Sequence, residues 1–237
     1  MTGLLLDTPL ELDQKDCVQT IRSSGDALLT LINDILDFSK IESEKLDLEE
    51  HPFDLQTCLE ESIDLLAAKA CEKGLELAYF IDPETPTMVI GDITRVRQIL
   101  VNLLSNAVKF TSHGEVLVSV SAKQLEVEQN LQNLAGENIS EFHTCDIWPV
   151  YEIQFSVKDT GIGIAETDIK HIFEPFRQIN QTMSRKYAGT GLGLAITKSL
   201  VKMMDGKLSV ESELAKGSIF RVEFPRYINI KSESENA

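Results

Sequence analysis

The sequence is poor in several features that would each point to a particular class of protein. Its 237 residues contain four cysteines, and no two of them form a Cys-x-x-Cys pair. This spacing argues against a disulfide framework and a zinc site, and it is typical of free thiols in a reducing compartment. No apolar run approaches the roughly 20 residues of a membrane-spanning helix, and residues 1–7 lack the basic region of a signal peptide. We therefore expect a cytoplasmic protein, or the cytoplasmic part of a larger, membrane-attached one.

Positive charge is also scarce. There are 22 Lys and Arg residues against 38 Asp and Glu residues, which gives a formal net charge of −16. A polyanion would be repelled at long range, so no nucleic acid is expected as the principal partner.

The four histidines have no spacing typical of metal ligands, and we expect each to be an ordinary surface or structural residue; they are His51, His113, His143 and His171.

The first part of the chain is expected to form one long helix. From residue 12 to about residue 45 the only glycine or proline is Gly25. Apolar residues recur there at steps of three, four and seven, as one face of a helix requires, and they include Val18, Ile21, Leu28, Ile32 and Ile35. Other apolar residues widen this face, so partner helices are expected around it. Residues 1–8 are predicted to end a preceding helix of a hairpin; an N-terminal helix packed on its own domain is the alternative.

The remaining sequence predicts an α+β domain. Helices are expected at 55–72, 93–110, 166–172 and 192–204, and strands at 75–81, 88–90, 115–122, 150–158, 207–213 and 218–224. Asp92 is the candidate N-cap of the helix at 93–110. We interpret 124–149 as an insertion at a hairpin tip and expect 229–237 to be disordered. The predicted organisation is a helical segment at 1–48, followed at 49–228 by a two-layer sandwich of helices on a mixed, mostly antiparallel sheet.

Three polar residues form a stripe on the helix predicted at 93–110. Asn102, Asn106 and Lys109 are spaced four and three apart, so they lie along the edge of the apolar face. An amide oxygen there can hold hydrated Mg²⁺, and an ammonium group can contact phosphate. The alternative, which the helix alone favours, is a polar flank that makes ordinary hydrogen bonds.

The strand predicted at 150–158 is followed by a carboxylate with the parity of its apolar face. A buried Asp159 needs a donor, and the exocyclic amine of adenine is one. Gly161 and Gly163 would let a flat ligand approach the backbone. The alternative is an aspartate that caps a turn. Asp-Thr-Gly is also the aspartic-protease triplet, but that chemistry needs two facing loops, which here would require a homodimer.

A second glycine-rich segment, Gly189–Gly193, opens the helix predicted at 192–204. Backbone N–H groups at a helix N-terminus favour phosphate. The segment matches neither the dinucleotide fingerprint nor the P-loop, because no strand precedes it and no Gly-Lys-Ser/Thr follows. The polar residues 177–188, which include Arg185 and Lys186, are interpreted as a mobile lid over a nucleotide or, alternatively, as a surface loop.

Together these segments resemble the catalytic, ATP-binding region of sensor histidine kinases of the hybrid type, whose fold is shared with gyrase and the mismatch-repair ATPases. Residues 92–111 are similar to the family's asparagine box, and 159–164 resemble its first glycine box. Residues 173–176 are similar to its phenylalanine box, and 189–194 to its second glycine box. The four motifs occur in the family's order, and the resemblance extends from residue 1 to about residue 227.

The resemblance implies a role for each matching residue. Asn106 would coordinate Mg²⁺, while Asn102 and Lys109 would support the metal and the phosphates of ATP, which makes these three the expected catalytic residues. Asp159 would bind adenine. The rest of the expected ATP-binding set is Gly161, Gly163, Ile164, Phe176, Arg185, Lys186, Gly189, Thr190, Gly191, Leu192 and Gly193. Ala188 stands where these kinases often have another glycine, and this departure would stiffen the lid.

The long helix resembles the second helix of the family's dimerisation and phosphoacceptor hairpin. The acceptor motif, His-Glu-x-Arg-Thr-Pro or close to it, belongs on the first helix, and no histidine precedes His51 in this chain. The implied function is transfer of the γ-phosphate of ATP, with Mg²⁺, to a histidine outside this chain in a two-component system. The implied partners are the phosphoacceptor helix, a response-regulator receiver domain and a second copy of the chain. A nucleotide-binding interaction module without turnover is the alternative, and a stand-alone ATPase lacks a candidate base.

Overall fold

The computed structural model describes residues 1–43, 46–125, 149–178 and 190–229. It contains α1 (Thr2–Leu6), α2 (Leu12–Glu42), β1 (His51–Asp54), α3 (Leu55–Glu72), β2 (Glu76–Ile81), β3 (Met88–Gly91), α4 (Ile93–Phe110), β4 (Glu115–Gln124), β5 (Val150–Asp159), α6 (Glu166–Ile169), α7 (Gly193–Met203), β6 (Lys207–Glu213) and β7 (Gly217–Asn229). No helix within these ranges is long and apolar enough to cross a membrane.

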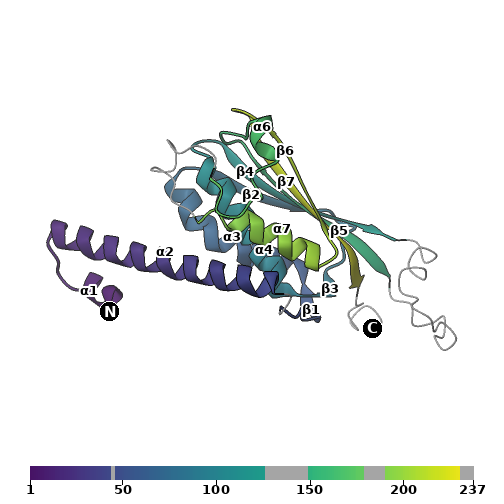
Figure 1. Ribbon diagram of the computed structural model, residues 1–237, viewed down its shortest axis with the longest axis horizontal. Coiled ribbons are helices and arrows are strands. Elements are labelled where there is room, and N and C mark those ends of the chain that lie inside the picture. The colour runs from purple at the N-terminus through teal and green to yellow at the C-terminus, as the bar shows by residue number, and fades with distance from the viewer. Residues whose placement is uncertain (44–45, 126–148, 179–189, 230–237) are drawn as a thin grey trace.

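The strands form one mixed sheet, and helices α3, α4 and α7 cover one of its faces (Figure 1). The strand order is β1-β3-β7-β5-β4-β2, with β6 paired to β7. Only the β2–β4 pair is parallel among the described strands. Because β4 and β5 are antiparallel neighbours, the segment between them connects a hairpin, as predicted. Residues 126–148 of that segment lie outside the described ranges. The predicted α+β class and mostly antiparallel sheet are confirmed.

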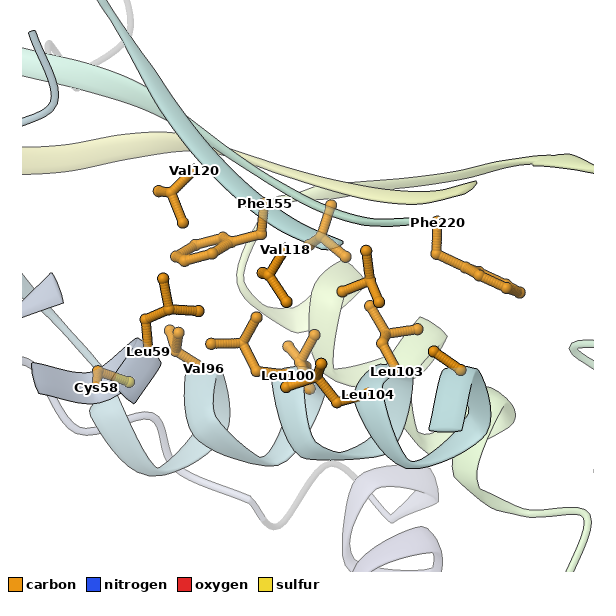
Figure 2. Close-up of a cluster of buried hydrophobic side chains, with 14 of the residues drawn as sticks. Cys58, Leu59, Val96, Leu100, Leu103, Leu104, Val118, Val120, Phe155 and Phe220 are labelled. Atoms are coloured by element: carbon orange, nitrogen blue, oxygen red, sulfur yellow. The ribbon is translucent and has the colours of Figure 1, made fainter. Parts of the chain in front are cut away.

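The core lies between the sheet and helices α3, α4 and α7, and of these helices α4 has the most buried residues. Asp92 caps this helix as predicted, because its carboxylate accepts from the backbone N–H of Arg95 at 3.0 Å. The apolar face of α4 points at the sheet, where it meets side chains of β4, β5 and β7 (Figure 2). Its fully buried members are Val96, Ile99, Leu100, Leu103, Leu104, Ala107 and Val108. The polar stripe of Asn102, Asn106 and Lys109 therefore runs along the edge of this buried face.

Helix α2 packs on the domain only through its C-terminal part. Phe38 and Ile41 pack against the core, whereas the N-terminal half extends away from α3, α4 and α7 (Figure 1). Leu28 is 59% exposed and Ile35 is 41% exposed. The apolar face predicted to need partner helices is thus open to solvent over most of its described length. The short α1 folds back beside α2.

Three elements differ from the sequence expectations. Strand β1 was not predicted, because four residues in an acidic stretch give too short a pattern, yet Phe53 is buried and β1 pairs with β3. Helix α6 ends at Ile169 rather than at residue 172. Strand β7 continues to Asn229, a residue expected in the disordered tail. It passes Pro225 because the register shifts between Tyr151 and Ile153, and such an irregularity tolerates a residue without an N–H. Residues 230–237 lie outside the described ranges.

Candidate nucleotide-binding site

The predicted stripe on α4 lies at the edge of the core, beside the start of α7. Asn102, Asn106 and Lys109 are all half-buried. The side-chain amide of Asn102 donates to the carbonyl of Gly193 at 3.4 Å, and a Cβ on Gly193 would come within 3.3 Å of the Asn102 Oδ1 atom. The amide stripe and the second glycine-rich segment, which are 91 positions apart along the chain, therefore meet in one place.

Lys109 is a cation without an anionic partner among the described residues. Its Nζ atom lies 4.9 Å from the centroid of the Phe110 ring. Burial lowers the pKa of Lys109, and the charge of Lys69 lowers it further. No described carboxylate lies within ion-pair distance of this ammonium group. A half-buried ammonium group in this position favours an incoming anion such as a phosphate.

Asp159 is buried at the end of β5, on the apolar side of the strand, as its parity predicts. Burial raises the pKa of Asp159, while backbone hydrogen bonds from Gly161 and Ser218 act in the opposite direction. The Gly161 N–H donates to Oδ1 at 2.8 Å. Asp159 therefore caps the turn, as the alternative interpretation held. The cap does not occupy the full acceptor capacity of the carboxylate, because its two oxygens can accept about four hydrogen bonds. Acceptor capacity remains for a donor such as an amine of a base.

The two glycines after Asp159 are required by close contacts within the protein itself. A Cβ on Gly161 would lie 2.6 Å from the carbonyl oxygen of Phe110. A Cβ on Gly163, where φ is +65°, would lie 2.0 Å from the carbonyl oxygen of Glu213. The expected reason for these glycines was the approach of a flat ligand. In the structure the space beside them holds the end of α4 and the β6–β7 turn, so the glycines dock the loop onto both.

A substitution at one of these glycines gives a measurable stability prediction. Gly163→Ala should lower the free energy of unfolding by roughly 2 kcal/mol or more, because it adds a backbone clash to an unfavourable φ. Gly25→Ala is the matched control, since nothing lies within 4 Å of a Cβ there. Alanine at position 25 should be neutral or slightly stabilising in its exposed helix. Urea denaturation of both variants measures the difference, and equal midpoints would contradict the close packing.

The second glycine-rich segment contacts the phenylalanine segment, residues 173–176. Phe176 donates its backbone N–H to the carbonyl of Gly191 at 3.0 Å. Gly191 has a φ of +73°, and a Cβ there would lie 2.9 Å from the Phe176 backbone. The Phe176 side chain is 65% exposed, whereas Leu192 is buried at the start of α7. The predicted site residues Arg185, Lys186 and Gly189, together with most of the predicted lid, lie outside the described ranges.

Helix α2 contacts the second glycine-rich segment and α4 through two carboxylates that the sequence analysis did not place in the site. Thr190 donates its hydroxyl to Asp34 Oδ2 at 2.9 Å and accepts from the N–H of Leu192 at 3.1 Å. Asp37 Oδ2 accepts from the side-chain amide of Gln98, on α4, at 2.7 Å. Burial raises the pKa of Asp34, the hydrogen bond from Thr190 lowers it, and the charge of Asp37 raises it. Because Asp34 and Asp37 are three residues apart, the sequence places them on one face of α2. It does not indicate which part of the protein that face contacts.

The donor set determines which metal the site could hold. Within the described residues there is no group of three His, Cys, Asp or Glu side chains placed to bind a metal ion. The oxygen donors at this edge are the amides of α4, and Mg²⁺ is often bound through one or two protein oxygens together with substrate phosphates and water. The residues present therefore fit a Mg²⁺ ion that arrives with a phosphate-bearing ligand rather than a resident metal in a protein cage.

Comparison with family models gives two matches. The model described as "Histidine kinase-, DNA gyrase B-, and HSP90-like ATPase" matches residues 91–228. The model described as "His Kinase A (phospho-acceptor) domain" matches residues 1–44, and this stretch contains no histidine. The second match covers α1 and α2, the first covers the chain from the end of β3 through β7, and residues 45–90 lie in neither match.

Individual proteins agree with these matches. "Hybrid signal transduction histidine kinase B" of Dictyostelium discoideum is 41% identical over 222 residues, which cover 94% of this chain and 10% of that protein. The crystal structure of full-length ShkA in complex with AMPPNP is 34% identical, with a TM-score of 0.72, and covers 98% of this chain and 42% of that one. Histidine kinase ThkA in complex with response regulator protein TrrA is 21% identical, with a TM-score of 0.60 over 92% of this chain and 53% of that one, and shares the fold. The chain thus spans a minor part of its curated relative.

Proposed function

Because this chain belongs to the histidine kinase-, DNA gyrase B- and HSP90-like ATPases and corresponds to the catalytic region of a sensor histidine kinase, we propose that it transfers the γ-phosphate of ATP to a protein histidine. One observation carries the proposal. Helix α4 contacts both glycine-rich segments: Asn102 contacts Gly193 at the start of α7, and the Phe110 carbonyl at the end of the helix contacts the loop after Asp159. A site with a cation, neutral oxygen donors and a buried carboxylate suits a nucleotide triphosphate with its metal.

Each half of the nucleotide has a matching group. Asp159 would accept from the exocyclic amine of adenine, which supplies the donor that a buried carboxylate needs. Lys109 would contact phosphate oxygens as a partly desolvated point charge. Mg²⁺ would be held by the Asn106 side-chain oxygen, with Asn102 in support. When bound, the ion would neutralise phosphate charge, while the protein's own contribution is to place the phosphates for transfer.

The partners follow from the long helix and from the fold. Residues 1–44, which match the phosphoacceptor model, contain no histidine, so the proposed acceptor lies outside this chain. The exposed apolar residues of α2 would pack against that acceptor helix and against a second copy of the chain, and they include Ile21, Leu28, Leu29, Ile32, Ile35 and Leu36. A response-regulator receiver domain is the proposed next acceptor, by analogy with the ThkA–TrrA complex.

The alternative function is a nucleotide-binding module that docks on a partner without turnover. The absence of a histidine from residues 1–44 favours this reading for the 237 residues taken alone. The two functions differ in one observable outcome. The kinase labels an added acceptor helix when it is given ATP labelled at the γ-phosphate, and the binding module does not.

Substitution of the buried carboxylate tests the adenine contact. Asp159→Asn should weaken ATP binding at least about tenfold, or roughly 1.4 kcal/mol, because an amide presents donors where adenine also presents one. Isothermal titration calorimetry measures the affinity. Asp64→Asn, which changes an exposed carboxylate on α3 in the same way, is the control and should leave the affinity unchanged. Equal affinities for Asp159→Asn and the unmodified chain would remove this residue from the site.

The pKa shift of Asp159 separates this loss from a folding defect. Burial raises the pKa of the folded carboxyl above its unfolded value. The folded state therefore binds the proton more tightly than the unfolded state. As the pH rises from the unfolded pKa through the folded pKa of Asp159, deprotonation of this carboxyl lowers the free energy of unfolding. At pH 7 Asp159→Asn removes this cost, so its thermal midpoint should equal or exceed that of the unmodified chain. A lower midpoint together with weaker ATP binding would assign the residue to folding instead.

A further inference from the structure

The last turn of α4, which carries Asn106 and Lys109, ends with carbonyl groups that need partners from outside the helix. The final four carbonyls of a helix have no partner within it. The Ala107 carbonyl accepts from the backbone N–H of Thr111 at 3.0 Å. The Phe110 carbonyl accepts from the N–H of Ile162 at 3.3 Å, in the loop after Asp159. The other two of these four carbonyls, those of Val108 and Lys109, need a donor from elsewhere in the protein.

A single side chain from α3 satisfies both of them. The Lys73 Nζ atom donates to the carbonyl of Val108 at 2.6 Å, of Lys109 at 2.9 Å and of Thr111 at 3.1 Å. An ammonium group has three N–H donors, enough to serve all three carbonyls. Lys73 is the C-cap residue of α3, and Gly74, with a φ of +66°, turns the chain directly after it. The ends of two helices are thus joined by one cation.

Water cannot readily replace this cation. Val108 and Thr111 are both 0% exposed, and a buried carbonyl without a donor loses the full free energy of its hydration. A positive charge at a helix C-terminus is also favoured by the helix dipole. Without Lys73 the last turn of α4 would have to shift or fray to reach water. That turn sets the positions of Asn106 and Lys109, and its Phe110 carbonyl contacts the loop of Gly161.

We propose that Lys73 is a positioning residue for the metal and phosphate half of the nucleotide site. It acts through the backbone of α4 and touches no part of the ligand. The inference rests on the proposed function, because it assumes that Asn106 and Lys109 bind Mg²⁺ and phosphate. Its specific consequence is that the loss of Lys73 should affect the phosphate half of the ligand more than the adenine half, which depends on Asp159 at the end of β5.

The test compares two ligands on the full 237-residue chain. Affinities for Mg-ATP and for adenosine are measured by titration, each at a temperature where circular dichroism shows the variant to be folded. In Lys73→Met the ratio of Mg-ATP affinity to adenosine affinity should fall at least about tenfold, with adenosine affinity within about twofold of the unmodified chain. Lys73→Arg keeps the charge and several donors, and should restore the ratio to within about threefold. Lys123→Met, which removes an exposed lysine from β4, is the control and should not change it.

Each outcome decides one question. An unchanged ratio in folded Lys73→Met would overturn the positioning role, even if its thermal midpoint falls, because a purely structural residue lowers stability without discriminating between ligands. If Lys73→Met does not fold, Lys73→Gln takes its place: a threefold or larger fall in the ratio supports the proposal, and no fall overturns it. If the unmodified chain binds neither ligand, the proposed function fails, which is distinguishable from failure of the role of Lys73.

Discussion

Replacement of Asn106 by alanine should abolish the contribution of Mg²⁺ to nucleotide binding. The side-chain oxygen of this half-buried residue is the proposed protein ligand of the metal. Its loss should weaken Mg-ATP binding about 100-fold, or about 2.7 kcal/mol. Binding of ATP in the presence of a chelator should stay within about twofold of the unmodified chain, because the adenine contact at Asp159 is separate. Calorimetric titrations with and without Mg²⁺ measure both quantities.

Two further variants make this result specific. Asn33→Ala removes an exposed amide from α2 and should change neither titration. Asn106→Asp places a charge where a neutral ligand is proposed, and should change the metal dependence without restoring the binding of the unmodified chain. If Mg²⁺-dependent and metal-free binding fall together in Asn106→Ala, the polar stripe of α4 is structural. The alternative interpretation, a polar helix flank that makes ordinary hydrogen bonds, would then be correct.

The second large effect concerns phosphoryl transfer by the chain itself. Incubated with ATP labelled at the γ-phosphate, the 237-residue chain should remain unlabelled, because no imidazole is held in line with the phosphate. Of its histidines, His51 and His113 are exposed and His171 contacts Glu174 through Nδ1 at 2.6 Å. His143 lies outside the described ranges. A polypeptide that joins the phosphoacceptor helix of a related kinase to Met1 should instead acquire acid-labile, base-stable phosphate.

The joined polypeptide needs its own control. Substitution of the acceptor histidine by glutamine should return the label to background while ATP binding is retained. The 237-residue chain should dimerise more weakly than the joined polypeptide, because only the joined polypeptide contains both helices of each hairpin. Stable labelling of the shorter chain, mapped to one of its four histidines, would show that the acceptor has been misplaced.

Local patterns in the sequence were sufficient to predict most elements of the fold. The spacing of apolar residues on α4 predicts a helix with one buried face, and the structure confirms both its bounds and its N-cap. The alternation along β5 predicts that Asp159 lies on the apolar side, where it is buried. These predictions succeed because each depends on residues within one element, where the period of the backbone decides which side chains share a face.

Contacts between distant segments could not be predicted in the same way. Nothing in the sequence around Lys73 indicates that its ammonium group caps a helix 35 positions away. The same holds for Asp34 and Thr190, which are 156 positions apart and hydrogen-bonded. Gly161 was predicted as a position where a flat ligand approaches the backbone, whereas in the structure its close neighbour is the Phe110 carbonyl. In each case the partner is set by the packing of whole elements, and residue type alone does not specify it.

The most direct test of the account is phosphoryl transfer in trans. The 237-residue chain is mixed with the joined polypeptide carrying Asn106→Ala, so that the only intact nucleotide site and the only acceptor histidine lie on different molecules. With Mg²⁺ and labelled ATP, we expect acid-labile, base-stable phosphate on the joined polypeptide, and none when Asp159→Asn replaces the unmodified chain. Absence of label, although the chain binds Mg-ATP and the two polypeptides associate, would contradict the kinase assignment and leave a nucleotide-binding module.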